Sequence, residues 1–245
     1  MAIFRGNDGD NRIFGTSVAD SIFGMSGDDS LYGGNGNDLV DGGSGNDHIN
    51  AGQGHNRVLG GEGNDFILSG TGNDVINAGS GNDSIYAGNG HNRIVAGEGN
   101  DVVMTGTGAD NIAAGEGNDR VRAGSGNDTL IGGEGDDLLM GEAGADRLWG
   151  QEGNDTLNGG TGNDTMTGGE GADVFVFNGG RDVITDFDSD DDRIDLSAFT
   201  GIDSFADMRG VSRQIGSDVV ITIGTSQLVI EDMRLQSLGA DDFSF

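Results

Sequence analysis

Aspartates recur every nine residues along most of this chain, at a spacing that suggests metal binding. A glycine-rich unit, Gly-Gly-x-Gly-x-Asp-x-U-x with U apolar, repeats in phase through nineteen copies. Carboxylate and carbonyl oxygens are the ligands that hard divalent cations prefer, and repeats of this kind are typical of calcium sites. We therefore predict that the sixth-position aspartates bind Ca2+: Asp20, Asp29, Asp38, Asp47, Asp65, Asp74, Asp83, Asp101, Asp110, Asp119, Asp128, Asp137, Asp146, Asp155, Asp164 and Asp173.

Each repeat also predicts its own local structure. Its glycine-rich half favours a turn, because glycine adopts positive φ angles that other residues resist. Its x-U-x half favours a short strand with U pointing inward, and an apolar residue occupies U in every copy, from Ile13 to Phe175. Two units then form one coil of 18 residues. The predicted fold is all-β, a parallel β-roll (a two-sheet solenoid) with a mainly β C-terminal cap.

The pattern changes after Phe175, which divides the chain into two predicted segments. Residues 6–176 form the repeat β-roll. Residues 177–245 form the cap, in which residues 182–187, 193–196, 218–223 and 227–231 favour strands. Residues 204–209 favour a short helix.

Composition limits the possible functions. The chain has 42 acidic residues against 12 arginines, no lysine or cysteine, and a net charge of −30. This negative charge excludes nucleic acid as a partner. The chain has few apolar residues and its negative charges repel one another, so we predict that it needs a cation to fold. No apolar stretch is long enough for a transmembrane segment, and the N-terminus shows no cleaved signal peptide.

The repeats resemble those of the RTX, or haemolysin-type, calcium-binding proteins exported by bacteria. Beyond the repeats, the segments 171–177, 182–187 and 192–199 resemble the region that closes the β-roll in serralysin-type secreted proteases. The end of the chain, Asp241-Asp-Phe-Ser-Phe245, is similar to the family's uncleaved secretion signals. The resemblance implies a secreted, extracellular bacterial protein that uses the type I secretion apparatus. Because the repeats begin near Met1, we expect no effector domain upstream.

The resemblance also implies where calcium binds. In the family, each ion lies between the turns of two successive coils on one side of the roll. We call the turns of Asn11, Asp29 and every eighteenth residue to Asp173 the first column, and those from Asp20 to Asp164 the second column. The gaps allow up to about 17 ions, which would nearly neutralise the chain. Asn56 and Asn92 lack a carboxylate, so the second-column sites beside them should be weak or empty.

Two surface features suggest further roles. His55, Arg57, His91 and Arg93 form a candidate ligand patch, which is either a trace of a 36-residue duplication or a site for an anionic polysaccharide. Outward apolar residues on one sheet form a candidate interface, for self-association or for packing of the cap: Phe66, Leu68, Tyr86, Val102, Met104, Leu138 and Met140. Ordinary strand propensity would also explain these residues.

We therefore expect a secreted, non-enzymatic calcium-binding protein that folds on Ca2+ outside the cell. It would act as a matrix, surface or interaction component. One alternative is a carbohydrate-binding accessory module for an alginate-like polysaccharide. Another is a membrane-active secreted protein similar to NodO. We predict no catalytic residues, because the histidines lack a paired base or nucleophile.

Overall fold

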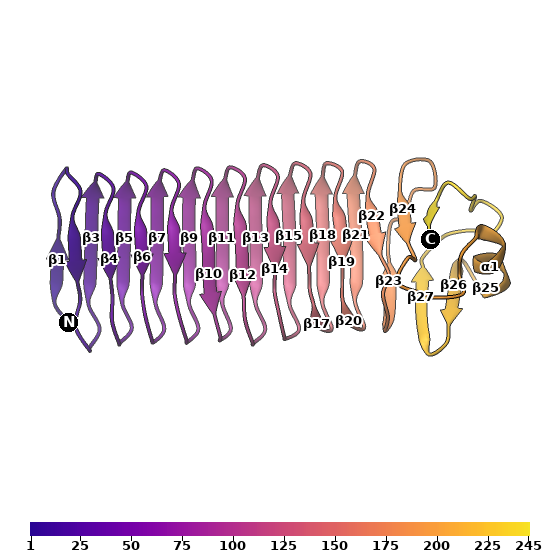
Figure 1. Cartoon of the computed structure of the whole chain (residues 1–245), viewed down its shortest axis with the longest axis horizontal. Helices are drawn as coiled ribbons and strands as arrows, with labels where there is room; N and C mark the ends of the chain where they lie inside the picture. The colour runs from indigo at the N-terminus through magenta and orange to yellow at the C-terminus, as the bar shows by residue number, and fades with distance from the viewer.

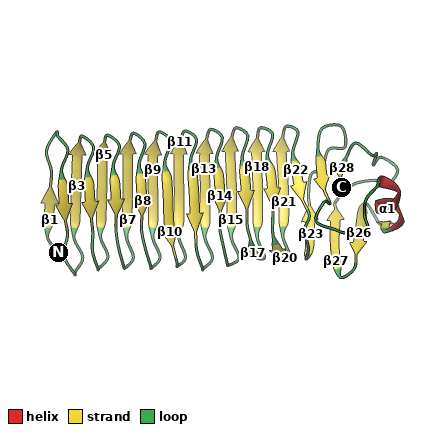
Figure 2. Cartoon of the chain, viewed as in Figure 1, coloured by secondary structure: helices red, strands yellow, loops and turns green.

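The computed structural model describes all 245 residues and is a rod of stacked coils, closed at one end by the C-terminal segment (Figure 1). Two sheets run along the rod, a 14-stranded sheet that we call sheet A and a 12-stranded sheet that we call sheet B. Eleven strands of each sheet come from successive coils. The predicted parallel β-roll is therefore confirmed, and it contains almost no helix (Figure 2).

The strands of both sheets are short and follow one another along the rod. Sheet A consists, in spatial order, of β1 (Ile3–Arg5), β3 (Ser21–Ser26), β5 (Leu39–Ser44), β7 (Arg57–Glu62), β9 (Val75–Ser80), β11 (Arg93–Glu98), β13 (Asn111–Glu116), β15 (Thr129–Glu134), β18 (Arg147–Glu152), β21 (Thr165–Glu170), β23 (Arg181–Ile184), β27 (Ser226–Ile230), β26 (Asp218–Ile223) and β25 (Ser212–Ile215). Sheet B consists of β2 (Arg12–Phe14), β4 (Ser30–Tyr32), β6 (His48–Asn50), β8 (Phe66–Leu68), β10 (Ser84–Gly88), β12 (Val102–Thr105), β14 (Arg120–Arg122), β16 (Leu138–Met140), β19 (Thr156–Asn158), β22 (Val174–Val176), β24 (Arg193–Asp195) and β28 (Phe243–Ser244). A minor two-stranded sheet joins β17 (Ala143–Gly144) to β20 (Thr161–Gly162).

The register fixes which side chains are buried. Neighbouring strands of the repeat pair in parallel with an offset of 18 residues, as in Val40 opposite Val58. The U residues therefore stack in two rows between the sheets, and from Ile22 to Phe175 they are completely or almost completely buried. They belong to one continuous apolar cluster that extends into the cap. Because each coil adds only two such residues with their small neighbours, the core is thin along the whole rod.

The turns depend on positive φ angles at the second and fourth positions of the unit. Gly43 and Gly45 illustrate the rule, with φ of 108° and 125°. Three non-glycine residues occupy the second position with the same geometry: Met25, Glu142 and Gln151 have φ of 94°, 72° and 88°. Side chains in this left-handed region are strained, so these turns carry a local energetic cost.

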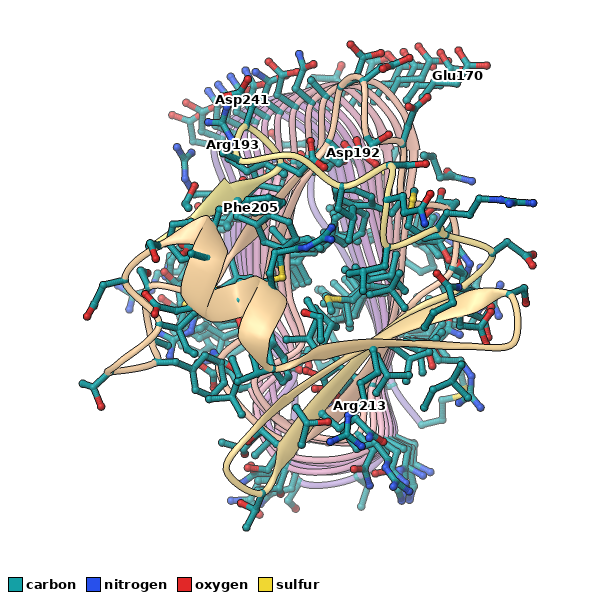
Figure 3. All side chains as sticks on the ribbon, turned by 90° about the vertical axis from the view of Figure 1, so that its right-hand side faces the viewer. Glu170, Asp192, Arg193, Phe205, Arg213 and Asp241 are labelled. Carbon is teal, nitrogen blue, oxygen red and sulfur yellow. The ribbon has the colours of Figure 1, made fainter.

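The C-terminal segment closes the end of the rod. β27 pairs in parallel with β23 and continues sheet A, with β26 and β25 following as an antiparallel meander. β28 continues sheet B beside β24. The helix α1 (Phe205–Gly210), capped by Ser204, lies across the open end of the roll in the view along the rod (Figure 3). No helix of the structure has the length and hydrophobicity to cross a membrane.

Candidate calcium sites along the turns

The sixth-position side chains line up in the two predicted columns and connect successive coils. From Asp29 onward one oxygen, Oδ1, accepts a hydrogen bond from the backbone N–H of the sixth residue in the preceding coil. The Asp29 N–H donates to Asp47 Oδ1 at 2.8 Å, for example, and the Asp20 N–H donates to Asp38 Oδ1 at 2.8 Å. The same contact recurs along both columns, so these carboxylates are part of the fold as well as candidate ligands.

The second carboxylate oxygen, Oδ2, has no protein partner in most turns. These buried oxygens accept no hydrogen bond at Asp29, Asp38, Asp47, Asp65, Asp74, Asp83, Asp101, Asp110, Asp119, Asp128, Asp137, Asp146, Asp155, Asp164, Asp173 and Asp182. Leaving a buried charged oxygen without a partner is costly, and proteins normally avoid it. The columns therefore contain regularly spaced acceptors that require a cation or a proton.

The electrostatics of the columns lead to the same requirement. Burial raises the pKa of Asp47, Asp101, Asp146, Asp155 and Asp173 to about 6, although backbone hydrogen bonds oppose the shift. Burial also raises the pKa of Asp65, Asp83, Asp119, Asp128, Asp137 and Asp182 to about 7. At several of these positions a carboxylate one coil away raises the pKa further, as Asp83 does at Asp65. The ion-free columns thus favour protonated carboxyl groups.

A backbone carbonyl lies beside the unpartnered oxygen in most units that begin with glycine. A methyl group built on Gly24 would lie closer than 3 Å to both Asp29 Oδ2 and the carbonyl oxygen of Gly42, in the next coil. Gly60 and Gly150 show the same arrangement. Glycine at this position therefore leaves space between a carboxylate oxygen and a carbonyl oxygen, and this oxygen pair fits the preference of Ca2+.

The acidic side chains are spread along the rod and do not gather at one point. No three acidic or histidine side chains converge as a metal-binding cluster. An ion in these turns would therefore take one or two carboxylates, with carbonyl oxygens of the glycine-rich backbone completing its ligands. When bound, calcium would supply positive charge that links the turns of successive coils.

Most of the predicted ligands share this geometry, with one exception at the N-terminal end. Asp20 Oδ2 accepts hydrogen bonds from the Thr16 N–H and hydroxyl, each at 2.7 Å. The Thr16 hydroxyl, followed by the Ala2 N–H, lowers the pKa of Asp20 below its ordinary value. This carboxylate is thus satisfied by the protein, unlike those further along the columns.

Sequence reasoning missed two residues that extend the columns. Asp182 accepts from the Asp164 N–H at 3.0 Å, and Asp192 accepts from the Asp173 N–H at 2.9 Å. Figure 3 shows Asp192 at the edge of the roll near the cap. The signal was present, because Ile184 and Ile194 follow these aspartates at the usual distance of two residues. Before Asp182 the fourth-position glycine is kept as Gly180 but the first and second positions are not glycine, and no glycine precedes Asp192 in its turn.

The candidate ligand patch lies on one edge and on the adjoining face of sheet A. His55 Nδ1 and His91 Nδ1 accept from the N–H groups of Asn73 and Ala109, both at 2.8 Å, in the next coil. Arg57 and Arg93 lie two coils apart on either side of Val75. Both arginines line a shallow depression of about 170 Å³ with Leu59, Val75, Asn77 and Val95. Neither forms an ion pair with a carboxylate.

The candidate apolar interface forms the outer face of sheet B. Its N-terminal half carries a ladder of rings with centroids 4.8 to 6.1 Å apart: Phe14, Tyr32, His48, Phe66 and Tyr86. The remaining predicted residues, Leu68, Val102, Met104, Leu138 and Met140, are half-buried by their neighbours. The expectation that the cap packs on this face is wrong, because β27 and β28 pair with the last coil at the end of the rod (Figure 2).

The fold and these columns define a β-roll whose turns present carboxylate and carbonyl oxygens in pairs, as calcium-binding repeat modules do. A family model for the RTX calcium-binding nonapeptide repeat matches overlapping segments that together span residues 5–184. The chain therefore belongs to the RTX repeat family. Repeats of this family bind calcium, and the aspartate-rich turns fit that role. RTX repeat domains are typically structural modules, and proteins that carry them are typically secreted by type I systems.

Two solved structures are similar to this chain. One is the crystal structure of the extracellular lipase LipA from Serratia marcescens, with 20% identity over 74% of this chain and a TM-score of 0.39. The chain spans 40% of the length of that lipase. The other is the solution structure of the AlgE6R3 subunit from the Azotobacter vinelandii mannuronan C5-epimerase, with 30% identity and a TM-score of 0.39. The match covers 53% of this chain and 79% of that subunit. No curated protein matches the sequence.

Proposed function

We propose that this protein is a secreted, non-enzymatic β-roll that folds as it binds calcium outside the cell. The observation that carries the proposal is the set of buried Oδ2 atoms without partners along both columns. Bringing these carboxylates together without cations is opposed by burial and by mutual repulsion, so the folded state needs positive charge. At cytoplasmic calcium levels the chain would remain extended, and it would fold at the higher calcium concentration outside.

Small-angle X-ray scattering tests this proposal. In chelator the radius of gyration should exceed that of the rod about twofold, because an unfolded chain of this length is much more expanded than a folded one. Millimolar Ca2+ should convert it to the scattering of a compact rod. A compact rod in chelator at pH 8 would contradict the proposal.

We further propose that residues 177–245 cap the roll and that the end of the chain is the export signal. Asp242 and Phe243 are nearly buried beside β24, whereas Phe245 is 39% exposed. A variant that ends at residue 240, expressed with a type I exporter, should stay inside the cell while the full chain reaches the medium. Equal export of both forms would contradict this part of the proposal.

The outer face of sheet B is the proposed contact surface, and a second copy of the chain is the proposed partner. No acidic residue belongs to the sheet B strands from β2 to β22, whereas the turns at both edges are rich in carboxylates. Two chains with a net charge of −30 repel each other, and this face is where close approach costs least. Its aromatic ladder provides apolar area for the contact.

A second candidate function is binding of an anionic polysaccharide by the ligand patch. The observation in its favour is the depression between Arg57 and Arg93, where two guanidinium groups have no acidic partner. An Arg57→Ala, Arg93→Ala variant should lose retention on an alginate column. Arg147→Ala, which removes a guanidinium from the same sheet further along the rod, is the matched control. Equal retention of all three proteins would exclude this patch as the binding site.

A further inference from the structure

Four consecutive turns of the second column are built differently from the rest. Their sixth residues alternate between amide and carboxylate: Asn56, Asp74, Asn92 and Asp110. Their first residues are Ala51, Ser69, Ala87 and Thr105, where most other turns have glycine. This stretch therefore brings side-chain hydrogen-bond donors to the place where other turns have a carboxylate oxygen and open space.

The asparagines keep one function of the aspartates and replace the other. Asn56 Oδ1 accepts from the Asp38 N–H at 3.0 Å, just as an aspartate would. Asn56 Nδ2 instead donates to the carbonyl oxygens of Gly54 and Ser69, each at 3.3 Å. Ser69 begins the next coil, so its carbonyl holds the place that the Gly42 carbonyl holds beside Asp29. The amide thus bonds to the oxygens that a cation would otherwise contact.

Asn92, two coils later, keeps the same bond through Oδ1 but directs its Nδ2 to its own turn. Its Oδ1 accepts from the Asp74 N–H at 3.1 Å, and its Nδ2 donates to the carbonyl oxygens of Gly88 and Gly90, each at 3.4 Å. An N–H group cannot be a metal ligand, and its hydrogen repels a cation. In both turns the protein therefore supplies the positive end of a dipole where calcium would supply charge.

The two aspartate turns of the stretch have a hydroxyl group at their first residue but keep an unpartnered carboxylate oxygen. Ser69 Oγ donates to the carbonyl oxygen of Ala87 at 2.8 Å, and Thr105 Oγ1 donates to that of Ala123. These carbonyls again belong to the first residue of the next coil, whereas Asp74 Oδ2 and Asp110 Oδ2 accept no hydrogen bond. Burial raises the pKa of Asp74 and Asp110, and the backbone N–H groups of Asn56 and Asn92, which donate to their Oδ1 atoms, oppose the shift.

The spacing of carboxylates along this stretch also differs from their spacing on the opposite edge of the roll. Because neutral asparagines alternate with aspartates, carboxylates lie two coils apart, or about 10 Å, instead of about 5 Å. On the first column the same coils keep Asp65, Asp83 and Asp101 in succession, each with an unpartnered Oδ2. Only that edge requires a cation at every coil.

We propose that the second-column turns of Asn56 and Asn92 take no calcium and are closed by the protein's own donors. In the middle of the rod the second column then binds calcium at fewer coils than the first column, because only the Asp74 and Asp110 turns keep an Oδ2 without a partner there. This inference rests on the proposed function, since it assumes that the other turns bind calcium. It gives the roll two turns on this edge that hold together when calcium is scarce.

Calcium stoichiometry tests the proposal, measured by equilibrium dialysis with 45Ca2+ at saturating calcium. An Asn56→Asp, Asn92→Asp variant restores the carboxylates and should bind two more ions than the natural chain. Asp83→Asn makes the reverse change on the opposite edge of the same region and should bind one ion fewer. Far-UV circular dichroism in calcium shows whether each variant has folded.

A second measurement uses the natural chain alone. Crystals grown in calcium should give anomalous difference peaks along the first column but none at the second-column turns of Asn56 and Asn92. Peaks at Asn56 or Asn92, or an unchanged stoichiometry in the Asn56→Asp, Asn92→Asp variant, would overturn this inference and leave calcium binding intact. A natural chain that binds no calcium at all would overturn the proposed function itself.

Discussion

At the scale of the residue, each sixth-position aspartate serves two purposes with its two oxygens. Oδ1 satisfies a backbone N–H of the preceding coil, as in the 2.7 Å bond from the Asp101 N–H to Asp119. Oδ2 remains for a cation. Asparagine keeps Oδ1 but has an NH2 group in place of Oδ2, so it can meet only the first requirement. Alanine has no side-chain oxygen and meets neither requirement. This division makes the two roles separable by mutation.

Substitution of Asp119 should separate them. Asp119→Asn should remove one bound calcium ion and keep the bond to the Asp101 N–H. Asp119→Ala should remove the same ion and also leave that buried N–H unsatisfied, which costs about 1–3 kcal/mol more. Calcium stoichiometry and urea unfolding at saturating calcium check both effects. Equal stability of the two variants would contradict the structural role of Oδ1.

The raised pKa values predict how the ion-free roll depends on pH. The ordinary pKa of an aspartate is 3.8, and burial raises those of Asp65, Asp83 and Asp119 to about 7 in the folded roll. The folded state therefore binds more protons than the unfolded chain. The stability that protonation contributes is fully present below about pH 4 and is lost as the pH rises through 6 to 7.

In chelator, the β-sheet signal in circular dichroism should therefore be larger at pH 5 than at pH 8. Sodium chloride at pH 8 is the control, because it screens repulsion without adding protons. Calcium affinity should change in the opposite direction and fall as the pH drops from 8 to 5. A chelated chain with the same spectrum at both pH values would show that the buried carboxylates do not limit folding.

At the scale of the element, the turns repeat one backbone geometry, and departures from it identify weak points. Gln151 has a φ of 88° at a position where Gly133 and Gly169, its neighbours in the stack, are glycines. Left-handed backbone costs about 1–2 kcal/mol for a residue with a side chain. Within the repeat turns this cost occurs at Met25, Glu142 and Gln151, and the fourth non-glycine residue with a positive φ, Asp232, lies in the C-terminal segment.

Gln151→Gly should stabilise the calcium-loaded roll by about 1 kcal/mol, because glycine adopts this φ without strain. Urea unfolding in saturating calcium measures the change. Glu152→Gly is the matched control, since Glu152 lies next in β18 without a positive φ, and it should leave stability unchanged or reduce it. A loss of stability in Gln151→Gly would show that the Gln151 side chain contributes more than its backbone strain costs.

The aromatic ladder of sheet B belongs to this scale as well. In calcium, the natural chain should form a dimer in sedimentation velocity experiments, and a Phe66→Ser, Tyr86→Ser variant should associate at least tenfold more weakly. Leu59→Ser on sheet A is the control and should behave as the natural chain does. A natural chain that stays monomeric at all concentrations would contradict the proposed contact.

Much of the element scale could be predicted from sequence, for a physical reason. A repeat with one inward apolar residue per nine gives each side chain a fixed place. The burial of Ile22, Val58 or Phe175 therefore follows from its position in the nine-residue unit alone. The cap is different, since β27 joins β23 across 46 residues and nothing periodic fixes that pairing. Asp192 was missed for a similar reason, because an extra residue shifts its offset to 19.

At the scale of the whole molecule, charge is separated by position around the rod. Carboxylates concentrate at the turns, whereas ten of the twelve arginines lie in strands of the two sheets: Arg5, Arg12, Arg57, Arg93, Arg120, Arg122, Arg147, Arg181, Arg193 and Arg213. The structure has one ion pair, between Arg122 and Glu142. The arginines therefore do not neutralise the columns, and a net charge of −30 with a thin core leaves that task to a cation.

Calcium completes this fold in the function we propose, and a calcium titration followed by far-UV circular dichroism is the decisive experiment. We expect a disordered spectrum in chelator at pH 8 and a cooperative transition to β structure, with a midpoint of about 10⁻⁴–10⁻³ M Ca2+. Magnesium at the same concentrations should not produce the transition, because Mg2+ demands a tighter octahedral site. A full β spectrum in chelator at pH 8 would show that the roll folds without calcium.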